Sequence, residues 1–381
     1  MVFYIDRSIH NTLLMRELSE DEEVFFANLA NKHRVGNCYL CGDIDSLETL
    51  SHRLGNPSGN IYRQIINHYS ESGTVINTVG TVIVLSFEES IHQDKLPSIL
   101  QTEDKVNFVP ISAAQNWSQD HLCCLLGENL NDCDFYESIA TYYCSKHGIK
   151  GLQIRFHHEN GGGNTICHVL KKCVQNDKST TLCIVDSDKK YGISKEYPQS
   201  PALGDTCLNA QEVSNALKHS NPFPPHMLYI LDVHEVENLI PIAILQMLKQ
   251  TELPDMRDGL DRLKSLIAVH DGEPILYYDF KDGFPYIKGL PQRAYWKQVL
   301  LELGYTEENM PPYDKKCDKL GNESNIVFPK LSNNNLLFRA ITVLRAMNIS
   351  SLSLESYLEP IWENLGQLML TWGCASSQFS A

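Results

Sequence analysis

Short apolar runs and helical patterns alternate along the middle of the chain, between residues 113 and 241. Strands are predicted at four apolar runs, which are residues 121–128, 152–158, 180–188 and the beginning of 227–241. In the segments between them, apolar residues recur every three or four positions, which predicts helices at residues 132–148 and 164–176. This alternation is typical of an α/β domain in which crossover helices connect the strands of a parallel sheet.

The region before this domain, residues 1–112, combines helical and β-branched segments. A helix is predicted at residues 19–33, where Ser19 is suited to be the N-cap and Glu22 the capping-box partner. The β-branched stretch at residues 74–87 predicts two short strands separated by a glycine. We therefore expect an N-terminal α+β region.

The region after the domain, residues 242–381, has mainly helical patterns. Helices are predicted at residues 242–250, 334–348 and 353–373. The apolar faces of the last two suggest homodimerisation as one use of this region. The predicted fold class is thus α/β, with a parallel sheet domain between an N-terminal α+β region and a mainly helical C-terminal region.

Composition places the chain among globular proteins. It has 381 residues, of which 43% are hydrophobic and 21% charged, so it can bury a sizeable core. The first residues lack the pattern of a secretory signal, and no apolar run reaches the roughly 18 residues that a membrane span needs. We expect a cytoplasmic protein without membrane contact, whose 12 cysteines are free thiols. The net charge of −15 argues against a module that binds nucleic acid by bulk electrostatics.

Acidic residues follow three of the predicted strands. They are Glu128, Asp186, Asp188, Asp232, Glu235 and Glu237. Because ligands bind at the carboxyl ends of strands in parallel α/β sheets, we expect these carboxylates to share one crevice. Oxygen ligands of this kind suit Mg²⁺ or Mn²⁺, which can act on a phosphodiester.

The residues beside these acids allow more than one interpretation. If the segment stays extended, Asp186 and Asp188 point to the same side and can share one cation. Asp132 falls in the first turn of a predicted helix, where it is either a further metal ligand or only a partner of the helix N-terminus. Lys189 is suited to neutralise a scissile phosphate, or is a solvated surface residue.

These motifs together resemble a known family. The order of GENLND, a GGG turn, IVDSD and HEVENLIP resembles the Toprim domain of topoisomerases, primases and OLD-type nucleases, and in particular the stand-alone Toprim proteins of bacterial anti-phage defence. The resemblance implies a Toprim-like (Rossmann-like) core. It implies metal ligation of Mg²⁺ or Mn²⁺ by a set of acids, which are Glu128, Asp132, Asp186 and Asp188, with a later acid at Glu235 or Glu237. The family has glycine after the first glutamate, whereas this chain has Asn129 there.

The resemblance also implies a function. It points to a metal-dependent endonuclease that cuts DNA or RNA as the effector of an anti-phage defence system. Such effectors are paired with an ATPase, and this chain has no Walker A motif of its own. The alternative is a degenerate Toprim scaffold that binds a partner ATPase without catalysis. A nucleotidyl- or phosphotransferase with the same metal site is a third reading.

A second metal motif lies in the N-terminal region. Cys38 and Cys41 form a C-x-x-C, and His52 follows eleven residues later, which suits half of a tetrahedral zinc site. His33 and His68 are candidates for the fourth ligand. The stretch also resembles the start of HNH-type nuclease modules, without their second C-x-x-C. Structural zinc, buried free thiols and a catalytic HNH centre are the three interpretations.

Overall fold

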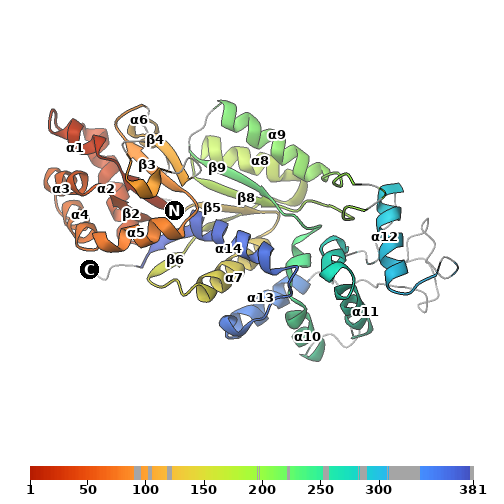
Figure 1. The fold of residues 1–381 in the computed structure, drawn as a ribbon. Helices are drawn as coiled ribbons and strands as arrows, with labels where there is room; N and C mark the ends of the chain where they lie inside the picture. The colour runs from red at the N-terminus through yellow and green to blue at the C-terminus, as the bar shows by residue number, and fades with distance from the viewer. Residues whose placement is uncertain are drawn as a thin grey trace.

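The chain forms two parallel sheets, each of four strands, with helices on both faces of each sheet (Figure 1). The structure, a computed structural model, describes residues 1–89, 96–101, 105–117, 122–194, 196, 198–220, 224–251, 257–281, 283, 290–306, 308 and 335–377. Within these ranges no helix is both long and apolar enough to cross a membrane. The α/β class predicted from the sequence is confirmed.

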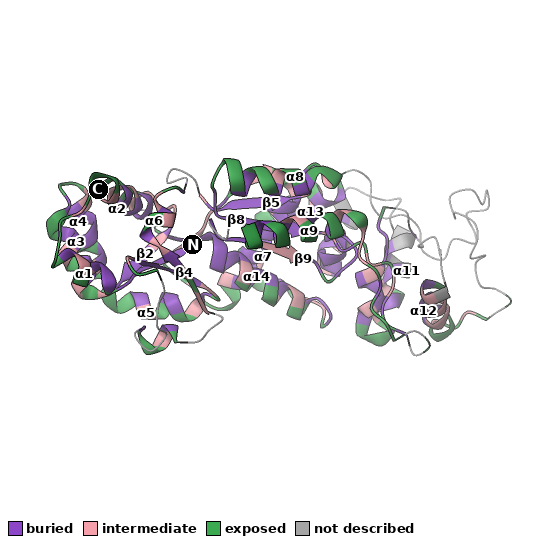
Figure 2. Cartoon of the chain, turned by 90° about the horizontal axis from the view of Figure 1, so that it is seen from above, coloured by how far each residue is buried: buried purple, intermediate pink, exposed green. Residues whose placement is uncertain are grey.

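The strands are short and mostly buried (Figure 2). They are β1 (Val2–Ile5), β2 (Tyr39–Gly42), β3 (Val82–Ser86), β4 (Val106–Pro110), β5 (Cys124–Gly127), β6 (Leu152–Ile154), β7 (His157–Asn160), β8 (Thr181–Val185), β9 (His226–Ile230) and β10 (Cys374–Ser376). The first sheet has the order β2-β1-β3-β4, and the second has the order β7-β5-β8-β9. All pairs within these two sheets are parallel.

The helices pack around these sheets. They are α1 (Ser8–Leu13), α2 (Glu20–Arg34), α3 (Ile44–Arg53), α4 (Ser58–Asn67), α5 (Tyr69–Thr78), α6 (Ile111–Ala114), α7 (Leu130–Lys146), α8 (Ile166–Lys171), α9 (Asp205–Ser220), α10 (Ile242–Thr251), α11 (Arg257–Ile267), α12 (Leu290–Glu302), α13 (Leu336–Ala346) and α14 (Glu359–Gly373). Figure 1 shows α8 and α9 on one side of the second sheet and α7 and α14 on the other.

The N-terminal region is a parallel α/β unit, so the expectation of an α+β region is wrong. The strand β1, which the sequence patterns did not reveal, lies between β2 and β3 and pairs in parallel with both. Its four residues are all buried, because parallel strands covered on both faces do not alternate between apolar and polar side chains. The described part of residues 242–377 is mainly helical, as predicted, and adds the short strand β10.

The stretch at residues 74–87 was expected to form two strands, and only the second half does. Residues up to Thr78 continue the helix α5, whose Val75 and Ile76 pack on the first sheet, and β3 begins at Val82. β-branched residues thus lie in a helix here because tertiary packing overrides their intrinsic preference. The cap predicted at Ser19 is confirmed, since its side chain accepts from the Glu22 amide in a capping box.

The second sheet separates two cores. Apolar side chains of β5 and β8 alternate between its faces, as expected for strands. One face contacts α7 and α14, where the Trp362 ring packs edge-on against Phe135 and Tyr142. The other contacts α8 and α9. The apolar faces of α13 and α14, which had suggested dimerisation, are buried within this same chain.

The two halves are tied together by the end of α14. Strand β10 follows that helix directly and pairs antiparallel with β6, while the Ser376 amide donates to the Cys38 carbonyl at 3.1 Å. Arg155 adds bonds from its guanidinium to the carbonyls of Val35 and Gly36 at 3.0 and 3.1 Å. The segment predicted as a single strand at residues 152–158 therefore divides into β6, which joins the halves, and β7, which belongs to the second sheet.

Candidate functional site

The carboxyl ends of β5 and β8 bring the first two acidic motifs into contact. Glu128 directly follows β5, and its Oε1 accepts a hydrogen bond from the Asp186 amide at 3.3 Å. Asp186 directly follows β8, which pairs with β5. The sequence had predicted that these residues lie at one edge of the sheet, and in the structure both follow neighbouring strands at that edge.

Asp132 lies beside Glu128 in the first turn of α7. Its Oδ2 accepts from the Asn129 amide at 2.9 Å and completes a capping box with that residue. Its Oδ1 is buried and has no hydrogen-bond partner. The side chain is only 3% exposed, and burial, with Glu237 and Glu128 nearby, raises its pKa to about 7. The interpretation of Asp132 as a partner of the helix N-terminus is therefore confirmed, and its second oxygen is available for a ligand.

The segment after β8 is bent, which corrects the expectation that Asp186 and Asp188 point to one side of an extended chain. The strand ends at Val185, and Asp188 has a φ of 55°, in the left-handed region. Asp188 is exposed, whereas Asp186 is half-buried. The bend is fixed because the Asp188 amide donates to the His234 carbonyl at 3.0 Å and the Ser187 hydroxyl donates to the Val233 carbonyl.

Gly204 makes room for Asp188. A Cβ atom at position 204 would lie 2.0 Å from Oδ2 of Asp188 and 2.7 Å from its Cβ. The Gly204 amide also donates to the Ser187 carbonyl at 3.0 Å. Glycine is therefore required where α9 begins, a need that the sequence did not signal because the contact is made across a loop.

The glycine turn after β7 holds the backbone of Glu128. The amides of Gly162 and Gly163 donate to the Glu128 carbonyl at 2.9 and 3.3 Å. Both glycines have a positive φ, of 65° and 61°. These amides thus fix the backbone of Glu128, which gives the turn a structural role.

The HEVEN segment after β9 supplies two more carboxylates. Glu235 and Glu237 are 4% and 7% exposed. Oε2 of Glu235 lies 2.8 Å from the Lys281 ammonium, and Oε2 of Glu237 lies 3.6 Å from it. Asn238 orders this turn, because its Oδ1 accepts from the Glu235 amide while its Nδ2 donates to two carbonyls of the segment before Lys281.

Lys281 is a site residue that the sequence analysis missed. Burial alone would lower the pKa of its ammonium, but the adjacent Glu237 and Glu235 outweigh that effect and the net shift is upward. Lys281 follows no strand of the second sheet and stands in a segment without a recognisable motif. Only the folded chain brings it to Glu235 and Glu237.

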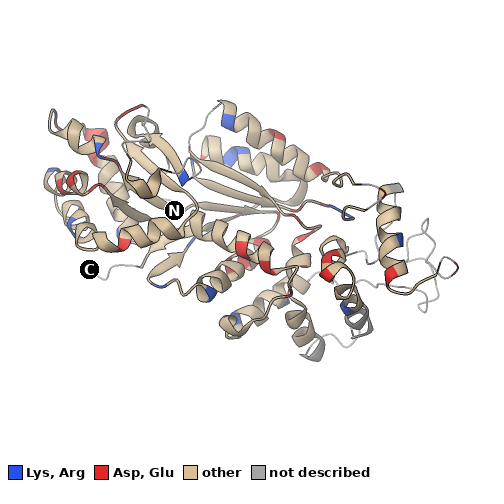
Figure 3. Ribbon diagram, in the orientation of Figure 1, with Lys and Arg blue, Asp and Glu red and all other residues tan. Residues whose placement is uncertain are grey.

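The electrostatics of the site favour a bound cation. Burial, with Glu128, Asp132 and Glu237 around it, raises the pKa of Asp186 well above the usual range. Burial, with Asp188 and Glu237 nearby, also raises the pKa of Glu128. Figure 3 shows acidic segments where β8 and β9 end. Carboxylates that repel one another and lack solvent are stabilised in their charged form by a divalent ion.

Lys189 is turned to a different partner from the one expected. Its ammonium pairs with Asp232, which follows β9 and is largely exposed. The amide of Lys189 accordingly sits beside Ser187, to whose hydroxyl it donates at 3.3 Å. Lys189 is thus neither a lone solvated residue nor a lysine aimed at a phosphate in this structure, and a contact with substrate requires the Asp232 pair to open.

The residues of the predicted zinc motif are not brought together. Cys38 packs in the core under α2, whereas Cys41 is on the opposite face of the first sheet and belongs to a second core. His52 is exposed on α3, and Nδ1 of the buried His33 accepts from the Leu40 amide at 3.1 Å. Cys38 immediately precedes β2 and Cys41 lies three positions further on, so extended backbone directs them to opposite faces. This arrangement favours buried thiols, and burial raises the pKa of Cys38 to about 11.

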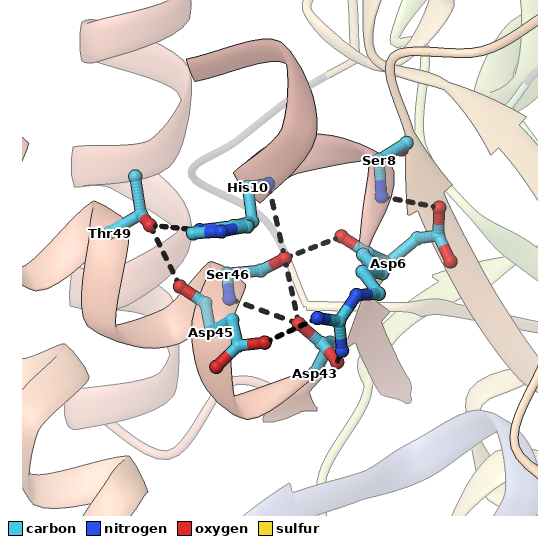
Figure 4. A network of polar contacts seen from close by, with 8 residues as sticks. Asp6, Ser8, His10, Asp43, Asp45, Ser46 and Thr49 are labelled. Carbon is cyan, nitrogen blue, oxygen red and sulfur yellow. Dashed lines mark hydrogen bonds and ion pairs between the residues drawn. The ribbon is translucent and has the colours of Figure 1, made fainter. Parts of the chain in front are cut away.

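The first sheet also has acids at its carboxyl edge, but there they are paired (Figure 4). Asp6 follows β1 and accepts from the Ser8 amide at 2.9 Å. Asp43 follows β2, caps α3 by accepting from the Ser46 amide, and lies 3.5 Å from Arg7. Arg7 also contacts Asp45 at 2.7 Å. This edge therefore satisfies its carboxylates within the chain.

The acidic carboxyl edge of the second sheet is thus the candidate functional site. Comparison of the chain with models of known families, with curated proteins and with solved structures finds no match.

Proposed function

We propose that the protein is a metal-dependent nuclease that hydrolyses phosphodiester bonds at the carboxyl edge of its second sheet. The observation that carries the proposal is the contact of Glu128 with Asp186 beside an unpartnered oxygen of buried Asp132. Glu128 and Asp132 both lie close enough to Asp186 to raise the pKa of its carboxyl group. Nucleic-acid hydrolysis is the reaction for which such clusters are suited, because a phosphodiester is anionic and repelled by acids unless a cation lies between them.

The residues present fit a divalent cation such as Mg²⁺ or Mn²⁺. Oxygen atoms of Asp132 and Glu237 are buried without a hydrogen bond, as expected for atoms that take a ligand. When bound, the cation would supply charge neutralisation and an activated water. In the chain itself, the Gly162 and Gly163 amides orient Glu128, Gly204 leaves space for Asp188, and Lys281 places a positive charge beside Glu237.

The cellular role belongs to the same proposal and rests on the resemblance to Toprim proteins. In this reading the protein is a cytoplasmic effector of anti-phage defence, and a partner ATPase controls its activity. The net charge of −15 is consistent with a chain that needs other surfaces to gather nucleic acid. The proposal includes both DNA and RNA as substrates.

The test is cleavage of plasmid DNA and of total tRNA by the purified chain with Mg²⁺ or Mn²⁺. It is compared with the Asp186→Asn/Asp188→Asn variant and with EDTA. The matched control is Asp43→Asn/Asp45→Asn, which makes the same two changes at the carboxyl end of a strand in the first sheet. We expect cleavage to be lost in the first variant and with EDTA, and kept in the control.

Cleavage that survives in the Asp186→Asn/Asp188→Asn variant would refute the proposed site. If the wild-type chain cuts neither substrate, Mn²⁺ binding separates the remaining cases. Binding that depends on Asp186 and Asp188 would mean that a partner is needed for activity, whereas the absence of binding would support the scaffold alternative.

A further inference from the structure

A second group of metal-binding side chains lies beside the proposed nuclease site and is not explained by it. His234, Glu235 and Asp279 each direct one ligand atom to a common point, and these atoms lie within 4.8 Å of one another. The three residues are 4%, 4% and 7% exposed. Burial of an imidazole with two carboxylates is costly unless an ion pair or a metal compensates their charges.

The imidazole of His234 makes no hydrogen bond with the described part of the chain. Its Nδ1 is buried without a partner, and its Nε2 lies 3.6 Å from Oδ2 of Asp279. That separation is long for a hydrogen bond. It is close to the ~3.4 Å that separates two ligands bonded at about 2.1 Å to one tetrahedral ion. The spacing of the ring and the carboxylate therefore suits a metal better than direct contact.

The backbone holds these three groups in place. The His234 amide donates to the Leu276 carbonyl at 2.8 Å, and the Phe280 amide donates to Oε1 of Glu235 at 2.9 Å. Oδ1 of Asp279 accepts from the Lys281 amide at 3.0 Å, and its Oδ2 lies 3.6 Å from Nε2 of His234. Ligands fixed by such second contacts are the mark of a preorganised metal site.

We propose that His234, Glu235 and Asp279 form a buried site for a transition-metal ion of the Mn²⁺ or Zn²⁺ type. The imidazole distinguishes it from the all-carboxylate edge of the second sheet, because an imidazole ligand suits transition metals such as Zn²⁺ better than Mg²⁺. Lys281 now neutralises Glu235 at 2.8 Å, and a metal bound by Glu235 would displace its ammonium toward Glu237, 3.6 Å away. The inference does not rest on nuclease activity.

A second group that contains a histidine is also a candidate metal site, but its contacts fit a metal less well. Asp134, Glu137 and His158 also direct ligand atoms to one point, but they are all half-buried. Asp134 is already paired with Arg345 at 2.9 Å. His158 lies 3.0 Å from Glu137, and this carboxylate raises the pKa of the imidazole, which favours a protonated histidine over a metal ligand.

The experiment measures Mn²⁺ binding by the full chain in an Asp186→Asn/Asp188→Asn background, which removes two carboxylates of the proposed nuclease site. Mn²⁺ is used because the cysteines of the chain would capture Zn²⁺. Affinity comes from the loss of the free-ion signal in electron paramagnetic resonance. Pulsed measurements then report whether an imidazole nitrogen is bonded to the ion. His234→Gln and Asp279→Asn are added to this background, with His158→Gln as the matched control.

We expect one Mn²⁺ with a nitrogen ligand in the background and in the His158→Gln control. In His234→Gln the nitrogen signal should vanish, and in both His234→Gln and Asp279→Asn the affinity should fall about tenfold or more. If one of the two variants fails to fold, the other carries the test. No nitrogen signal in the background, or one that persists in His234→Gln or is lost in the His158→Gln control, would overturn the inference.

Discussion

Asp132 shows how one side chain serves stability and a site at the same time. Its Oδ2 caps α7 through the Asn129 amide, and its Oδ1 is buried without a hydrogen bond. Since the carboxyl has a pKa of about 7 in the folded chain and an ordinary value near 3.8 when unfolded, the folded state binds the proton more tightly. The stability contributed by this proton is complete below about pH 4 and is lost as the pH rises through 7.

Asp132→Asn should therefore stabilise the metal-free protein, because asparagine keeps the cap and cannot ionise. The gain in the free energy of unfolding should be on the order of 2 kcal/mol larger at pH 8 than at pH 5. Urea denaturation in EDTA at the two pH values measures it. An equal gain in the free energy of unfolding at the two pH values would contradict the raised pKa of Asp132.

Gly204→Ala should impair the proposed nuclease without unfolding the chain. The added methyl group would meet Asp188 at 2.0 to 2.7 Å, so the carboxylate must move away. We expect cleavage to fall by about tenfold to a hundredfold, as is typical when a reactive group is displaced by about 1 Å. The control is Gly55→Ala, since a Cβ there meets nothing within 4 Å. Unchanged cleavage in Gly204→Ala would show that the position of Asp188 is unimportant.

The sequence revealed the site residues that follow strands, and Asp132 in the helix that begins after one of these strands. Glu128 and Asp186 could be predicted because apolar runs end at them, and the edge of a parallel sheet collects such positions. Lys281, Gly204 and the pair of His234 with Asp279 could not, because their contacts join segments that lie apart along the chain. The bend at Asp188 was missed because nothing local indicates a left-handed backbone there.

At the scale of elements, helix ends were easier to predict than short strands. The cap of α2 is local, because Ser19 and Glu22 satisfy each other's backbone amides. Strand β1 has four buried residues and no alternation, so only its place between β2 and β3 identifies it. The β-branched residues of α5 were misassigned for the converse reason, since the packing of the helix on the sheet decides their conformation.

Ser19→Ala tests the cap of α2. It removes the acceptor for the Glu22 amide and should lower the free energy of unfolding by about 1 kcal/mol. The matched control is Ser145→Ala on α7, an exposed serine within a helix, which should cost nothing. Chemical denaturation of both variants measures their free energies of unfolding. Equal stabilities would mean that the capping box does not contribute to stability in solution.

At the scale of the whole molecule, β10 joins the end of α14 to both halves of the chain. Ser376→Pro removes the amide that donates to the Cys38 carbonyl, and it also removes the buried hydroxyl that donates to the His33 carbonyl. We expect a loss of about 1 to 3 kcal/mol in the free energy of unfolding. Denaturation followed by fluorescence measures it, with Ser377→Pro, one exposed residue further on, as the control. Equal free energies of unfolding in the two variants would show that the contact of Ser376 with Cys38 does not stabilise the protein.

The two sheets have the same strand order, second-first-third-fourth in each half, so their edges can be compared position by position. Asp6 stands at the end of the leading strand in one, and Glu128 does so in the other. The first edge is neutralised by its own hydroxyls, amides and Arg7, whereas the second keeps a bare oxygen on Asp132. The first edge can therefore serve as a control for the second within one experiment. A bound cation should slow amide hydrogen exchange around Glu128 and leave the exchange around Asp6 unchanged.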